Sequence, residues 1–204
     1  MRGSLGSAAV AVGLAFTAAL APSTAMAHVG VGETSGFLLG FTHPFSGLDH
    51  ILAMAAVGLI AAQLGGRGLW LLPAAFLSIM AFAGALAMAG IGAPFVELAI
   101  GISIVALGGI VATGIRPSVV SAMAIVGFLA IWHGQAHGSE LPLGADALAY
   151  GLGFVVASAV LQLIGIGLGS MIARAAGKGQ GTVVVRSVGG GVTLAGIGIL
   201  FGLI

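Results

Sequence analysis

The sequence predicts an all-α membrane protein, in which a six-helix transmembrane bundle follows a cleaved signal peptide and the first helix is broken near Pro44-Gly47. Of the 204 residues, 59% are apolar and only 5% are charged, whereas about a quarter of the residues in soluble domains are charged. The apolar residues form long continuous runs without alternation, which argues for helices and against the strands of an outer-membrane barrel.

Residues 1–27 have the composition of a secretory signal peptide. Arg2 precedes an apolar run that reaches Leu20, and Pro22 is followed by a small-residue cleavage site that ends at Ala27. We expect cleavage before His28, so that residues 28–204 form a single six-span domain. The alternative is that the run remains as an uncleaved helix.

Six further apolar segments are each near the roughly 20 residues that a bilayer core of about 30 Å requires. They cover residues 45–64, 68–89, 94–114, 117–137, 147–173 and 182–203. Three prolines, Pro73, Pro94 and Pro117, are expected in first turns or at helix boundaries, where a missing amide is tolerated.

The basic residues predict the orientation of the bundle. They occur in or beside every second connection, and the positive-inside rule makes that side cytoplasmic. The opposite connections carry Glu140 and Asp146. Both mature termini are therefore expected in the periplasm of a bacterial inner membrane. The basic residues of the mature chain are Arg67, Arg116, Arg174, Lys178 and Arg186.

Several classes of protein are excluded by composition. The net charge of +1 without a basic run gives no sign of a nucleic-acid partner, and the chain has no cysteine for disulfides or thiolate metal sites. Gly177-Lys178-Gly179 lacks the Ser or Thr of a phosphate-binding loop, so ATP hydrolysis is not expected. Small-residue pairs such as Gly165 and Gly169 support tight packing but identify no dimer face, which leaves homo-oligomer formation open.

Ionisable side chains gather at the predicted outer end of three segments. Such residues at membrane depth mark functional sites by default. His133 and His137 are four residues apart and share one helical face. The candidate ligands from these segments are His43, Asp49, His50, Glu97, His133 and His137.

Each of these residues also has a structural interpretation. A single histidine near a membrane interface is more often a packing residue, Glu97 could be a helix N-terminal carboxylate, and Asp49 could simply orient the imidazole of His50. The cluster as a whole favours a site, because all five histidines lie toward the same side of a chain with only five acids.

Neutral imidazole and carboxylate form a ligand set for Ni²⁺, Co²⁺, Zn²⁺ or Cu²⁺ and disfavour Mg²⁺ and Ca²⁺. In a straight helix His43 and His50 would lie about 10 Å apart along the axis, too far for one ion. Pro44 and Gly47 therefore predict a broken helix that folds His43 back toward Asp49 and His50.

The run from His43 to His50, His-Pro-Phe-Ser-Gly-Leu-Asp-His, resembles the HPxxGxDH signature of the HupE/UreJ family. His133-Gly-Gln-Ala-His137-Gly is similar to the family's HGxxHG element. The resemblance spans the chain and implies a hydrogenase- or urease-associated nickel permease. It also implies metal roles for His43, Asp49 and His50, and for Glu97, His133 and His137.

The resulting hypothesis is a secondary permease that imports nickel or cobalt for metalloenzyme maturation, with no permanently bound cofactor and no enzymatic activity. Its expected partners are the divalent ion and the lipid bilayer. The amine and imidazole of His28 are a further candidate for ion capture, with a flexible tail as the alternative. Other hypotheses are an intramembrane zinc-dependent hydrolase and a metal-responsive membrane scaffold.

Overall fold

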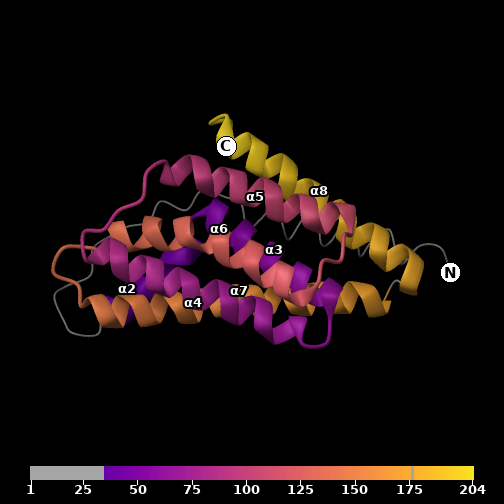
Figure 1. Ribbon diagram of the computed structural model, residues 1–204, viewed down its shortest axis with the longest axis horizontal. Helices are drawn as coiled ribbons and strands as arrows, with labels where there is room; N and C mark the ends of the chain where they lie inside the picture. The colour runs from indigo at the N-terminus through magenta and orange to yellow at the C-terminus, as the bar shows by residue number, and fades with distance from the viewer. Residues whose placement is uncertain (1–34, 176) are drawn as a thin grey trace. The chain divides into compact units, whose positions relative to one another are not determined.

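A computed structural model describes residues 35–175 and 177–204, and the predicted signal peptide and His28 lie outside these ranges. Over the described residues the chain is helical and contains no strand (Figure 1). The elements are α2 (Ser35–Thr42), the 3₁₀ turn η1 (His43–Phe45), α3 (Leu48–Leu64), α4 (Gly68–Met88), α5 (Val96–Thr113), α6 (Val119–Ser139), α7 (Ala147–Ala175) and α8 (Gly177–Leu200).

The observed helices follow the predicted segments closely, with two differences. Helix α8 begins at Gly177, several residues before the expected start, because the helix continues through a polar turn that the apolar pattern does not include. Pro73 is the sixth residue of α4, beyond the first turn in which we expected it, so its ring nitrogen gives up one hydrogen bond of the helix. Pro94 and Pro117 lie at helix boundaries as predicted.

The predicted break at Pro44-Gly47 is present. Helix α2 and η1 lie at 79° to α3. Gly47, the N-cap of α3, has an extended backbone. The 17 residues of α3 reach only about 26 Å, so α3 alone is shorter than a typical hydrocarbon core. In the part of the chain that the structure describes, five helices, α4 to α8, are long and apolar enough to cross a membrane, and a sixth crossing requires the bent pair to act together.

Within the described residues the closest helix pairs are α4 with α6, α5 with α8, α3 with α7, and α2 with α7 (Figure 1). Helices α4 and α6 run parallel, since Gly134 meets Met80 and Gly138 meets Gly84 in the same order along both. The order of the glycine contacts along two of the other pairs shows that α3 and α7 run parallel and that α5 and α8 run antiparallel. Small residues at these contacts let the backbones approach, as is common where lipid provides no hydrophobic drive between helices.

The distribution of polar and apolar side chains is that of a membrane bundle. Large apolar side chains point outward, among them Trp70, Phe82 and Val120. Such broad apolar exposure is untypical of a soluble monomer. The buried polar side chains among the described residues are His50, Ser103, His133, Gln135, Ser158 and Gln162.

Substitution of a glycine at the α3–α7 contact should destabilise the bundle. A Cβ at Gly165 would lie 3.1 Å from Gly58 Cα and still closer to Ala55 O, whereas a Cβ at Gly167 on the same helix meets nothing within 4 Å. We expect Gly165→Leu to cost about 1–3 kcal/mol through overpacking and to lower the thermal unfolding temperature in detergent. The matched Gly167→Leu variant should unfold like wild type. Equal unfolding temperatures for the two variants would contradict this packing.

Candidate metal centre

Four histidines from three elements meet at one end of the bundle, and we refer to them as the histidine cluster. His43 lies in η1, His50 in the first turn of α3, and His133 and His137 in the last turns of α6. The break between η1 and α3 lets two histidines of one short run approach α6 from different directions. His50 and His133 are fully buried, while the side chain of His137 is 12% exposed.

A continuous chain of hydrogen bonds links three of these histidines with Glu140. Glu140 Oε2 accepts from His43 Nε2 at 2.8 Å and from His137 Nδ1 at 3.2 Å. The other nitrogen of His137, Nε2, lies 2.9 Å from His50 Nδ1, and His50 Nε2 lies 3.0 Å from Ser158 Oγ. The chain therefore runs from a half-exposed carboxylate to a buried hydroxyl.

One tautomer assignment satisfies this chain when the rings are neutral. His137 donates from Nδ1 to Glu140, so its Nε2 accepts from His50 Nδ1. His50 Nε2 then accepts the proton of the Ser158 hydroxyl, since a neutral imidazole has one donor and one acceptor. The arrangement fixes the orientations of both rings without a charge on either.

Glu140 is the charged end of the chain. The hydrogen bonds from His137 and, second, from His43 lower the pKa of Glu140 from 4.5 to about 2, although partial burial acts in the opposite direction. The carboxylate is therefore ionised at any physiological pH. A fixed negative charge beside imidazole nitrogens favours a bound cation.

His133 has a nitrogen without a protein partner. The Ser103 hydroxyl donates to Ile100 O at 2.7 Å, so Ser103 Oγ accepts from His133 Nε2 at 2.8 Å. The remaining Nδ1 is then a bare lone pair, and it is buried without a hydrogen-bond partner among the described residues. The rings of His133 and His50 are 5.6 Å apart. A lone pair held in this way is available to a metal ion.

Aromatic side chains surround the cluster. Phe154 lies 4.3 Å from the ring of His137 and 5.1 Å from that of His50, measured between centroids. Phe76 lies 5.7 Å from His133, and Tyr150 lies 6.0 Å from His43. These contacts restrict ring rotation, and they reduce the access of water to the nitrogens.

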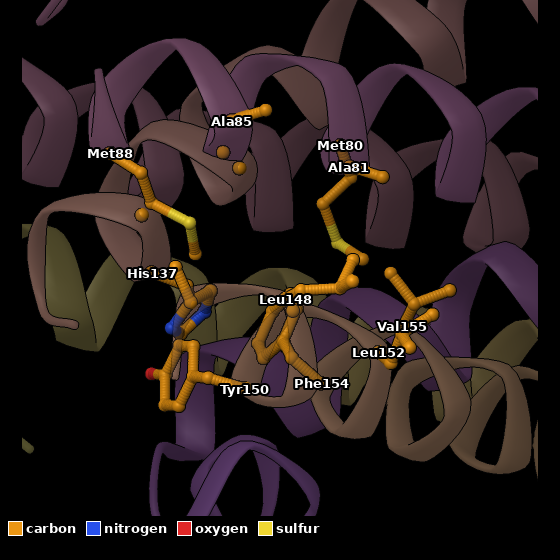
Figure 2. Close-up of a pocket in the computed structure, with 15 residues that line it drawn as sticks. Met80, Ala81, Ala85, Met88, His137, Leu148, Tyr150, Leu152, Phe154 and Val155 are labelled. Carbon is orange, nitrogen blue, oxygen red and sulfur yellow. The ribbon is translucent and has the colours of Figure 1, made fainter. Parts of the chain in front are cut away.

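A partly open apolar cavity of about 450 Å³ reaches His137 from the side, between α4, α6 and α7. Figure 2 shows His137 and Tyr150 beside each other at one end of it, with Met80 and Met88 projecting from α4. The cavity accounts for the exposed part of the imidazole. It is lined almost entirely by carbon, so the polar ligands lie only at its edge.

The predicted site residues are not all placed together. The carboxylate of Asp49 accepts the backbone N–H of His50 at 2.8 Å, in the first turn of α3. Glu97 is exposed in the first turn of α5, where an acid favours the helix dipole, and among the described residues no hydrogen bond joins it to the histidine cluster. The structure brings His43, His50, His133 and His137 together but not Asp49 or Glu97, and His28 lies outside the described residues. The metal roles of all seven residues remain predictions.

Sequence reasoning missed Glu140 as a site residue and treated it only as a marker of the outer side. Its ligand atom lies with those of His43 and His137 in a group whose members are all within 4.8 Å of one another. The signal was available, because Glu140 follows His137 by three residues and so shares its helical face. Ser158 had no comparable signal, since a lone serine in an apolar helix is usually a packing residue.

Comparison with known proteins agrees with the motifs. Residues 14–199 match the family model described as HupE / UreJ protein. The chain is 48% identical over 152 residues to Protein HupE of Rhizobium leguminosarum bv. viciae, which covers 74% of this chain and 79% of the relative. No solved structure matches the chain. With a family match that extends over nearly the whole length, and with the histidine motifs in place, this chain belongs to the HupE/UreJ family.

Proposed function

We propose that this protein is a secondary permease that carries Ni²⁺ or Co²⁺ from the periplasm to the cytoplasm for hydrogenase or urease maturation. One observation carries the proposal. His43, His137 and Glu140 come from η1, the end of α6 and the connection after it, and their ligand atoms lie within 4.8 Å of one another. Nitrogen and carboxylate oxygen suit a divalent transition metal.

Two neighbouring groups extend the proposed site. His50 lies one hydrogen bond behind His137, and His133 offers its unpaired Nδ1 beside the His50 ring. An ion that sheds its water shell at Glu140 can therefore exchange one imidazole for the next as it moves into the bundle. Successive replacement of ligands keeps the barrier between positions low.

The membrane potential is sufficient to drive import. A dication that enters a cell at an inside-negative potential of about 100 mV gains roughly 4.6 kcal/mol, which is twice the 2.3 kcal/mol per elementary charge. That energy corresponds to about thousandfold accumulation, so import needs no ATP hydrolysis. The proposed direction also rests on the positive-inside rule, since the mature chain's Lys and Arg lie in or beside the connections at the end opposite to the histidine cluster. This orientation places both mature termini in the periplasm and counts the bent pair α2–α3 as the first of six spans.

Radiolabelled nickel uptake by cells that express wild type or the His50→Ala variant tests the proposal. We expect wild type to show saturable uptake and His50→Ala to lose about 10- to 100-fold, because the chain from Glu140 to the buried Ser158 is then interrupted. Thr113→Ala is the control, since among the described residues the Thr113 hydroxyl bonds to carbonyls of its own helix. Equal uptake by wild type and His50→Ala would contradict the proposed site.

A further inference from the structure

Two facing stripes of residues extend from the histidine cluster into the bundle. On α3, Met54 follows His50 by four residues, and on α7, Gln162 follows Ser158 by four residues. Residues at this spacing lie on one helical face. His50 is hydrogen-bonded to Ser158, and one turn deeper Gln162 Nε2 donates to Met54 Sδ at 3.2 Å. The second pair lies about 6 Å further along the helices than the first.

The amide oxygen of Gln162 is unpaired among the residues that the structure describes. Ser158, Gln162 and Met54 are all fully buried, and Gln162 Oε1 makes no hydrogen bond within the described part of the chain. Leaving a buried acceptor unpaired is costly, because nothing compensates for the loss of its hydrogen bonds to water. Gln63, which joins α3 to α5, also leaves its Oε1 unpaired among the described residues. What distinguishes Gln162 is its position, one turn beyond His50 and Ser158 and in contact with Met54. Its unpaired oxygen is an atom that can bind a cation.

We infer that Gln162 and Met54 form a second, transient binding site for the divalent cation, one helical turn below the histidine cluster. This inference rests on the proposed transport function. An amide oxygen, a thioether sulfur and the nearby hydroxyl of Ser158 are neutral ligands. They hold a transition-metal ion more weakly than imidazole and carboxylate do. A weak inner site suits a permease, because conduction requires that an ion can both enter and leave.

The observed conformation closes the bundle immediately below this site. A Cβ at Gly58 would lie 2.8 Å from Gly165 Cα and in closer contact with Gln162 O. No side chain can stand between the two backbones there. The two stripes therefore end at Gln162 in this conformation. An ion at Gln162 could move further into the bundle only after α3 and α7 separate.

Transport and binding should respond differently to substitution of Gln162. We expect Gln162→Leu in proteoliposomes to reduce the initial rate of nickel influx about tenfold or more, because loss of a group beside a metal typically costs 10- to 100-fold. Equilibrium nickel binding by the purified variant should stay within about twofold of wild type, because the histidine cluster is intact. Gln162→Glu should bind a second nickel ion at equilibrium and should transport slowly, since a carboxylate retains the ion.

Gln63→Leu is the matched control. Gln63 is another glutamine of the bundle whose Oε1 is buried without a partner among the described residues. Its Nε2 donates to Val111 O of α5 at 3.1 Å, so it lies away from the α3–α7 stripes. This variant should transport like wild type. Influx through Gln162→Leu within about twofold of wild type would overturn the inference. So would parallel loss of influx and binding in that variant, which would indicate a structural role, or failure of Gln162→Glu to bind a second ion. If wild type itself showed no saturable nickel influx, that result would contradict the proposed transport function, on which this inference rests.

Discussion

Replacing His137 by alanine should abolish saturable nickel uptake and should weaken equilibrium nickel binding by about a hundredfold. His137 is the only residue that connects the exposed and the buried parts of the described cluster. Its Nδ1 bonds to Glu140 and its Nε2 meets His50, and its ring lies 4.9 Å from that of His43. Removal of the imidazole deletes a ligand of the three-residue group, and it also separates His43 and Glu140 from the histidines behind them.

The measurement must separate lost ligation from lost packing, because the His137 ring also contacts Phe154. His137→Leu keeps most of the side-chain volume without a nitrogen, so this variant should fold and should lose nickel binding as fully as His137→Ala. Ser139→Ala is the control on the same helix end, since the Ser139 hydroxyl donates to Ala136 O of its own helix. Equilibrium dialysis with radiolabelled nickel on the purified proteins measures the affinities. Wild-type affinity in His137→Leu would show that the imidazole is not a ligand.

Helix positions could be predicted from the sequence because lipid demands long apolar runs, and such runs are visible without knowledge of tertiary contacts. The break at Pro44-Gly47 was predictable for the same local reason, since proline and glycine both oppose continuation of a helix. The direction of the break was not predictable. We expected His43 to approach Asp49 and His50, yet η1 places it against Glu140, because α2 packs along the start of α7.

The predicted ends of the apolar segments brought the histidines to one end of the bundle, as the structure does, but they could not choose among the acids. Glu97 and Glu140 both lie near that end, and helical rise alone gives no rotation of one helix about another. Burial and partner contacts, which depend on how α5 and α6 pack, leave Glu97 exposed and bring Glu140 to two imidazoles. The contact between Gln162 and Met54 could not be predicted from the sequence either, since it depends on the register between α3 and α7.

Neutralising Glu140 should weaken nickel binding by about 10- to 100-fold while leaving the pH dependence of binding in place. Glu140→Gln keeps an oxygen acceptor for His43 and His137 but removes the charge that opposes the cation. Asp146→Asn is the matched control, because it makes the same change of charge in the same connection. Asp146 Oδ1 accepts the backbone N–H of Ala149 at 2.6 Å, and asparagine can retain such a cap.

The pH dependence of nickel binding distinguishes a contribution of the Glu140 carboxylate from a contribution of the imidazoles. The hydrogen bonds that lower the pKa of Glu140 to about 2 stabilise the folded state above pH 4.5 and are lost as the pH falls through that range toward 2. This effect is small, because the side chain is 48% exposed and is screened by solvent. Glu140 therefore stays ionised between about pH 5 and 7, so its charge is constant over that interval. Protons compete with a metal ion for an imidazole nitrogen, so acidification weakens binding through histidine ligands. Wild type and Glu140→Gln should both lose nickel binding on acidification over that interval, when measured by equilibrium dialysis. A flat profile in Glu140→Gln would identify the carboxylate as the group that titrates, and would contradict the hydrogen-bond geometry around it.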